Sequence, residues 1–197
     1  MKNSYFTIII VLLIIILSIK IYSDSDYVNL KCIISNLDGN TYCVRERNKL
    51  ELAADKLAKV NINLKKLIEY CKIQFPEKEN VKLLIENFNP KKIVETLPTS
   101  KYTAYSENKG EKLAFCLNNS KNGNKLIDSN TLMYVALHEI SHIASKSVGH
   151  TDEFWQNFKF FIEQSEILNI YKPIDYKKTP ARYCGMDITD NPYYDIK

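Results

Sequence analysis

The chain has 197 residues, 45% of them hydrophobic and 25% charged, which is typical of a folded domain with a core. Five glycines and six prolines exclude a collagen-like chain and a long low-complexity array. The formal charge of +4 is small for this length and is not gathered into a basic stripe, so the sequence gives no clear signal for nucleic-acid binding.

An apolar run opens the chain from Tyr5 to Tyr22 and contains one charged residue, Lys20. As a helix it would be roughly 27 Å long, enough to cross a hydrocarbon core of about 30 Å. We predict that residues 1–22 are an uncleaved membrane anchor, with the large domain on the non-cytoplasmic side. The alternative is a signal peptide cleaved after Ser23, which would make the protein secreted.

The next segment, residues 23–45, is predicted to be a stalk with a hairpin turn at Asp38-Gly39. Apolar residues then recur at intervals of three and four, which predicts an amphipathic helix over 48–71 that ends before Pro76.

Shorter elements follow. We expect a helix over 77–88, which an Asn-Pro turn ends, and a short helix around Ile93. Two β-rich runs, KYTAY and KLAFCL, then predict a β-hairpin over 101–117 that turns at residues 108–110.

The central helix is predicted to begin at Thr131, after N-cap candidates at residues 128–130, and to end at Gly149. Thr151 is expected to cap the next helix. The buried stripe of that helix is predicted to be Phe154, Phe158, Phe161 and Ile162.

The five cysteines form no C-x-x-C pair, which argues against a cysteine-based zinc site and a thioredoxin-type motif. We favour five unpaired cysteines that act as small buried hydrophobic residues. In an oxidising compartment, Cys32 and Cys43 would instead form a disulfide. The cysteines are Cys32, Cys43, Cys71, Cys116 and Cys184.

Residues 138–142 read H-E-I-S-H and match the H-E-x-x-H pattern. On a helix, His138 and His142 lie one turn apart on one face, so both rings can bind one Zn²⁺. Glu139 is rotated by about 100° from His138, which brings its carboxylate beside the open coordination position of the metal. We therefore predict that Glu139 is the general base.

A catalytic zinc takes three protein ligands, so a third must come from outside this turn. The remaining histidine of the chain is His150. We predict one Zn²⁺ per chain, bound by His138, His142 and His150, and a metallopeptidase that hydrolyses peptide bonds of a protein or peptide substrate. The alternative is a catalytically silent, membrane-anchored structural or interaction protein that retains the zinc site.

Other residues near the motif have weaker interpretations. The hairpin over 101–117 would bind an extended substrate by strand addition, or it would only support the fold. Three tyrosines follow the predicted helices, and one of them would be a further hydrogen-bond donor to the oxyanion. We favour a packing role for all three and include none of them in the predicted site. These tyrosines are Tyr171, Tyr176 and Tyr183.

At these residues the chain resembles the zincin metallopeptidases of the WLM and SprT-like group, on the segment TLMYVALHEISHIASKSVGHTDEFWQNF. In that group H-E-x-x-H is followed by Gly-His and a short acidic-aromatic helix start, which here are Gly149-His150 and residues 152–155. The resemblance implies His150 as the third zinc ligand. The chain is especially similar to small membrane-anchored WLM-like proteins of large DNA viruses, on the segments ENKGEKLAFCL and YCGMDITDNP.

The resemblance covers roughly residues 100–192 and implies an α+β zincin-like fold with helices packed on a small sheet. The wider group is linked to proteolysis of proteins trapped on DNA, whereas this chain lacks a basic tail and carries an N-terminal apolar segment. Seven residues separate His142 from His150, more than in many WLM relatives. We predict the metallopeptidase domain over 46–197, with its catalytic core at about 100–170.

Overall fold

The structure is a computed structural model that describes residues 2–23, 30–123 and 125–195. It opens with α1 (Lys2–Ser23). The elements that follow, in chain order, are β1 (Leu30–Ile34), β2 (Thr41–Arg45), α3 (Leu50–Gln74), α4 (Glu79–Asn87), β3 (Ile93–Glu95), β4 (Ala104–Glu107), β5 (Lys112–Phe115), α5 (Ser129–Ile143), α6 (Asp152–Ile167), β6 (Ala181–Tyr183), β7 (Met186–Ile188) and a 3₁₀ turn, η1 (Pro192–Tyr194).

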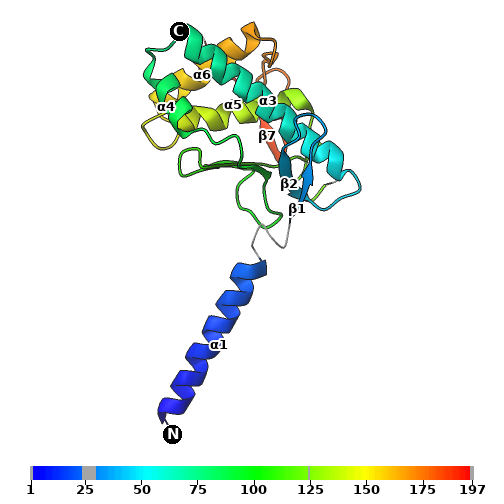
Figure 1. The fold of residues 1–197 in the computed structure, drawn as a ribbon, viewed down its shortest axis with the longest axis vertical. Helices are drawn as coiled ribbons and strands as arrows, with labels where there is room; N and C mark the ends of the chain where they lie inside the picture. Colours follow the sequence, from blue (N-terminus) through cyan, green and yellow to red (C-terminus); the bar gives the residue numbers. More distant parts are fainter. Residues whose placement is uncertain (1, 24–29, 124, 196–197) are drawn as a thin grey trace.

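α1 is the long N-terminal helix in Figure 1. Its segment Tyr5–Tyr22 has 18 residues with a mean hydropathy of 2.6, and none of that segment is buried. By length and composition the helix suits a membrane span or a signal sequence, so both interpretations of the N-terminus stay open.

β1 and β2 form an antiparallel hairpin whose turn is the predicted one, with Gly39 at φ +70. Tyr42 and Val44 of β2 are buried in the core, where the hairpin contacts α3. The hairpin therefore packs on the domain. The division of the chain at residues 22 and 45 stays a prediction, and residues 24–29 of the predicted stalk lie outside the described residues.

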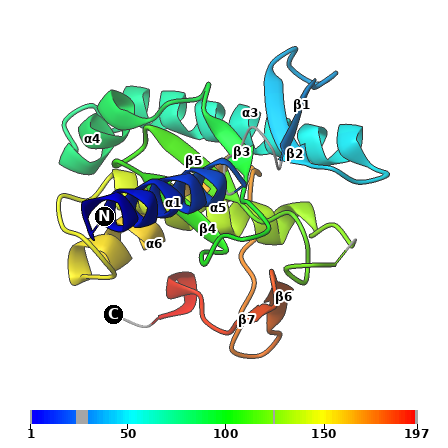
Figure 2. The same cartoon turned by 90° about the horizontal axis from the view of Figure 1, so that it is seen from below.

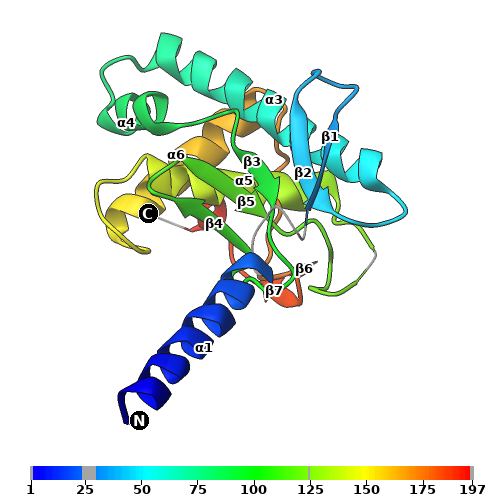
Figure 3. The ribbon, with the colours of Figure 1, turned by 60° about the horizontal axis from the view of Figure 1, so that its bottom comes forward.

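The helices predicted over 48–71 and 77–88 are confirmed as α3 and α4, within three residues at each end. β3, β5 and β4 form a sheet in that order, with β3 parallel and β4 antiparallel to β5. α3 and α5 pack on this sheet and α6 packs on α5 (Figure 1). Figure 3 shows β4 at the sheet edge farther from α3, and the β1–β2 hairpin beyond β3 at the other edge.

The segment around Ile93 is strand β3, so the short helix predicted there is wrong. Ile93 and Val94 pair in register with β5, as their β-branched side chains favour. Glu95 is fully buried: its carboxylate accepts a hydrogen bond from the backbone N–H of Arg45 at 2.7 Å and forms an ion pair with Arg47. These partners lie far away in the sequence, where a local pattern does not reveal them.

α5 begins at Ser129, two residues before the predicted start, because Asp128 is the N-cap and accepts a hydrogen bond from the backbone N–H of Thr131 at 2.8 Å. It ends at Ile143, so the predicted end at Gly149 is wrong. The residues beyond Ala144 form a loop that polar side chains hold from outside the helix.

The prediction for α6 is confirmed. Thr151 is its N-cap and accepts a hydrogen bond from the backbone N–H of Phe154 at 3.4 Å. The predicted stripe is fully buried and faces α5 and the core: Phe154, Phe158, Phe161 and Ile162.

The favoured prediction of five unpaired cysteines is wrong. Disulfides join Cys32 to Cys43, as in the alternative prediction, and Cys116 to Cys184, a pair that the sequence analysis does not predict. Among the described residues, Cys71 is the free cysteine, and it is buried as a small hydrophobic residue. Strand pairing places Cys32 directly opposite Cys43, whereas the fold brings Cys184 to Cys116 from 68 residues away.

The β6–β7 hairpin lies beside α5, on the side away from α3 and α4 (Figure 2). The backbone N–H groups of Cys184 and Gly185 donate to the carbonyl oxygens of Asn118 and Asn119, at 2.9 and 2.8 Å. Together with the disulfide to Cys116, these bonds tie the hairpin to the chain just after β5. The hairpin thereby forms a wall next to the H-E-x-x-H turn.

Candidate metal site

α5 presents His138 and His142 on one face, one turn apart, while its other faces are buried. The ring of His138 meets Phe154 and Phe158 of α6 edge-on, with centroids 4.8 and 5.2 Å apart. The ring of His142 stacks on Phe154 at 4.2 Å. Core packing therefore fixes the direction of both imidazoles.

His150 reaches the same point from the loop before α6. Its Nε2 lies 3.0 Å from Nε2 of His138, and Nε2 of His142 lies 3.2 Å from that same atom. Unlike the other two histidines, His150 is exposed. The structure thus brings all three predicted ligands together.

This donor set fits one bound cation. Nitrogens that each lie about 2.1 Å from a tetrahedral Zn²⁺ are about 3.4 Å apart, close to the spacing of these Nε2 atoms. Hydrogen bonding satisfies the cluster poorly, because Nε2 of His138 has one hydrogen or one lone pair but faces two other ring nitrogens. A shared metal ion would satisfy all three.

The electrostatics favour neutral rings. Burial lowers the pKa of His138 to about 3 and that of His142 to about 4, and the neighbouring rings add to both shifts. Both rings are therefore neutral at pH 7, which is the form of histidine that binds metals.

Glu139 lies next to the histidines and is only 6% exposed. Burial raises the pKa of its carboxyl group to about 8, and a hydrogen bond from the backbone N–H of Ser106 acts in the opposite direction. Ser106 belongs to β4, so the edge strand of the sheet positions this carboxylate.

Two cavities meet at this turn. One, of about 540 Å³, opens between β4 and the loop before α6, and its lining includes His138, Glu139, His142 and His150. The other, of about 270 Å³, shares His138 and Glu139 and extends toward the β6–β7 hairpin. Its walls are mainly apolar and include Tyr134, Val135, Phe158, Tyr183, Met186 and Ile188.

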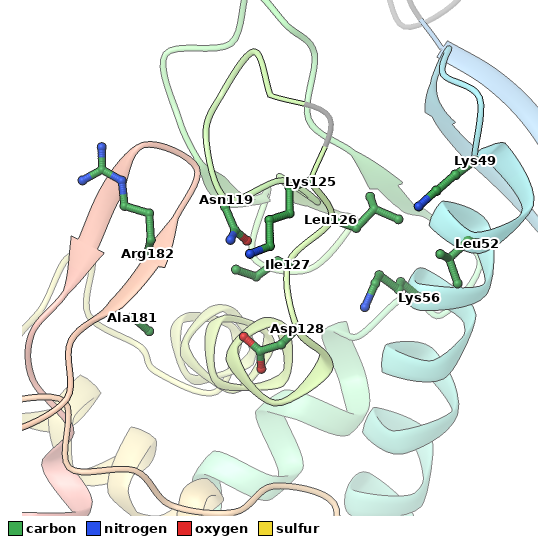
Figure 4. A pocket seen from close by; sticks show the side chains of 10 residues that line it. All are labelled: Lys49, Leu52, Lys56, Asn119, Lys125, Leu126, Ile127, Asp128, Ala181 and Arg182. Atoms are coloured by element: carbon green, nitrogen blue, oxygen red, sulfur yellow. The ribbon is translucent and has the colours of Figure 1, made fainter.

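A separate cavity of about 590 Å³ lies at the N-terminal end of α5 (Figure 4). Basic side chains line it, and Asp128 at its base is already occupied as the helix cap. None of the described residues that line it is a histidine. Its size does not make it the better candidate, since the three histidines and the buried Glu139 that could hold a metal and activate water lie at the other site.

The tyrosines have structural roles. The hydroxyl group of Tyr183 accepts a hydrogen bond from the backbone N–H of Cys116 and donates one to the carbonyl oxygen of Thr103, both at 3.1 Å. Tyr171 and Tyr176 are buried and pack on Tyr134. Two other residues contact the loop before His150, Lys109 and Glu153. Glu153 belongs to the acidic-aromatic helix start of the resemblance, whereas no local pattern singled out Lys109.

The chain is similar to proteins of large DNA viruses. It is 36% identical over 193 residues to uncharacterized protein R325 of Acanthamoeba polyphaga mimivirus. This match covers 96% of this chain and 95% of the relative. The chain belongs to the same family as this mimivirus protein. A shorter match, 31% identical over 75 residues, links 38% of the chain to 41% of uncharacterized protein 136R of Invertebrate iridescent virus 6. No protein-family model matches the chain.

Among solved structures, a crystal structure of a Wss1 mutant from Saccharomyces cerevisiae is similar, with a TM-score of 0.50 at 15% sequence identity. The match covers 64% of this chain and 88% of that one. This likeness concerns the fold alone. It confirms the predicted α+β class.

Proposed function

We propose that this protein is a zinc-dependent metallopeptidase, in which His138, His142 and His150 hold one Zn²⁺ and Glu139 is the general base. The convergence of three Nε2 atoms beside a buried carboxylate is the observation that carries the proposal. When bound, zinc supplies Lewis acidity, which lowers the pKa of water toward 7 and polarises the scissile carbonyl group.

Glu139 would take a proton from the attacking water and deliver it to the leaving amine. Its position suits both steps, because its side chain lines the same cavity as the three histidines. The hydrogen bond from the N–H of Ser106 holds the carboxylate toward the cavity that the histidines line.

The free edge of β4 would bind the substrate backbone. The N–H of Ser106 bonds Glu139, so it points away from β5; because strand residues alternate, the backbone groups of Ala104 point the same way. An extended peptide can pair with Ala104 by strand addition. An apolar side chain of this peptide would then fit the cavity of about 270 Å³ that begins at His138 and Glu139.

We also propose that α1 anchors the protein in a membrane, with the domain on an oxidising side. The disulfides Cys32–Cys43 and Cys116–Cys184 support this placement, because disulfides persist mainly in oxidising compartments. The mass of the mature chain tests the anchor: an intact N-terminus is expected, and loss of residues 1–23 would identify a cleaved signal peptide.

The activity is tested with the full chain in detergent micelles, loaded with zinc and mixed with a library of unstructured peptides. We expect cleavage by the natural sequence and a loss of roughly 10²-fold or more in Glu139→Gln, with bound zinc unchanged. Equal cleavage by both proteins would contradict the role of Glu139. A zinc-loaded natural protein that cleaves no peptide would favour the silent structural or interaction protein instead.

A further inference from the structure

The turn of the β4–β5 hairpin has an unusual backbone. Asn108, Lys109 and Gly110 all have positive φ, at 46, 57 and 119°. A Cβ atom at Gly110 would lie 2.6 Å from the carbonyl oxygen of Asn87, so only glycine fits there. The carbonyl oxygen of Gly110 also accepts a hydrogen bond from the backbone N–H of Asn89 at 3.2 Å. The turn is thus locked against the end of α4.

From this turn, Lys109 reaches the loop that follows α5. Its Nζ donates to the carbonyl oxygens of Ser145, Lys146 and Ser147, at 2.5, 3.0 and 2.9 Å. An ammonium group has three hydrogens, and all three are used here. Lys109 therefore binds the loop through its carbonyl groups and has no donor left for another partner.

Glu153, in the first turn of α6, binds the amide side of the same loop. Its carboxylate accepts hydrogen bonds from the backbone N–H groups of Lys146 and Ser147, at 2.8 and 3.0 Å. Hydrogen bonds from the Ser147 hydroxyl group and from these amides lower the pKa of Glu153 to about 2. The carboxylate is therefore charged throughout the neutral range.

Other contacts also hold the start of this loop: Asn157 of α6 donates to the hydroxyl group of Ser145 at 2.9 Å, Lys146 forms an ion pair with Glu79 of α4, and the hydroxyl groups of Ser147 and Thr151 lie within hydrogen-bond distance at 2.6 Å.

The tip of the loop has few contacts. Val148 is 86% exposed, and a Cβ atom at Gly149 would meet nothing within 4 Å. His150 is exposed too, and apart from the other two histidines its ring contacts Phe154 and Trp155, with centroids 4.8 and 5.7 Å apart. Core packing therefore does not fix the backbone from which His150 extends.

We infer that Lys109 and Glu153 are positioning residues that clamp residues 145–147 from both sides and so hold His150 against His138 and His142. The inference rests on the proposed metal site. Without the clamp, His150 would be in place in a smaller fraction of molecules. The apparent zinc affinity would then fall in proportion to that fraction. Partners that orient a metal ligand typically contribute about 10–100-fold in affinity.

The test measures the zinc dissociation constant of the full chain in detergent, by competition with a chromophoric chelator. We expect Lys109→Gln and Glu153→Gln each to weaken zinc binding by about 10–100-fold, and the double variant to approach but not exceed the loss in His150→Ala. Thermal melting of the metal-free proteins is measured in parallel. We expect little change there for Glu153→Gln, because this side chain lies at the surface.

Matched controls separate the clamp from general charge effects. Asp152→Asn removes a carboxylate from the same first turn of α6, and Lys91→Gln removes an exposed lysine near the end of α4. Both should bind zinc within about twofold of the natural protein. If Asp152→Asn weakened binding as much as Glu153→Gln, charge at the helix end would explain the effect and the clamp would be refuted.

The remaining outcomes distinguish the clamp from the proposed function. If Lys109→Gln and Glu153→Gln bind zinc as the natural protein does while His150→Ala loses it, the clamp is wrong and the metal site stands. If the natural protein itself binds no zinc, the proposed function and the clamp are both overturned.

Discussion

The two sides of the candidate metal site are built differently. His138 and His142 stand on α5, a helix buried against the sheet and α6, so the same contacts that stabilise the core orient their rings. His150 stands on an exposed loop, and polar groups of the β4–β5 turn, α4 and α6 hold that loop. Two ligands therefore depend on the stability of the whole domain, while the third depends on a few hydrogen bonds.

This difference also explains where the site tolerates variation. A change of length within α5 would rotate His138 relative to His142, because helical neighbours share a face only at fixed spacings. The loop after Ala144 can change length as long as His150 returns to the same point. The seven residues between His142 and His150 form such an adjustable connection.

The largest effect is expected on the buried side. Phe158→Ala removes a fully buried ring that packs on both His138 and Phe154. We expect the free energy of unfolding to fall by about 3–5 kcal/mol, measured by urea denaturation of the metal-free protein. A loss below about 1 kcal/mol would mean that the α5–α6 contact does not hold the helical ligands as described.

The next largest effect is expected from removing the disulfide between Cys116 and Cys184. Cys116→Ser combined with Cys184→Ser removes a crosslink between positions 68 residues apart, and we expect a loss of about 2–4 kcal/mol in unfolding free energy. Zinc affinity, measured where both proteins are folded, should change by less than about threefold, since the disulfide holds the β6–β7 wall and no ligand. A collapse of zinc binding in this variant would show that the wall also positions the histidines.

A third effect depends on pH. The folded-state pKa of Glu139, about 8, lies above its ordinary value of 4.5, so its contribution to stability is complete below pH 4.5 and is lost as pH rises toward 8. In the metal-free protein, Glu139→Gln should therefore raise the free energy of unfolding by up to about 3 kcal/mol at pH 7 and by almost nothing at pH 4. Denaturation curves at these two pH values check this, and a difference independent of pH would contradict it.

The smallest effect is expected at the tip of the loop. Val148 is 86% exposed and lies between the clamped residues and His150, so Val148→Ala should change the free energy of unfolding by less than about 0.5 kcal/mol. Zinc affinity should stay within about twofold. A large loss in either quantity would show that packing of the loop, and not its polar contacts, holds the third ligand.

Local patterns predicted the helical part of the site well. The spacing of His138 and His142, the Thr151 cap and the aromatic stripe of α6 each depend on residues within one or two turns, where sequence periodicity is informative. The hairpin that carries β4 and β5 was also predictable from its β-rich runs.

Features that depend on distant partners were not predictable. β3 looked like a short helix because its pairing with β5, and the arginines that neutralise Glu95, come from elsewhere in the chain. The end of α5 was misplaced because glycine is a common helix terminator, whereas here side chains of the β4–β5 turn, α4 and α6 bind the loop after Ala144. The partner of Cys116 likewise comes from the far end of the domain.

Metal content gives the most direct test of the central claim, that three histidines from two differently built regions share one zinc ion. The full chain and its His150→Ala variant would be purified side by side, dialysed against the same low zinc concentration and analysed for zinc per chain. We expect one zinc per chain in the natural protein and far less than one in the variant. Equal zinc in both proteins, or none in either, would contradict it.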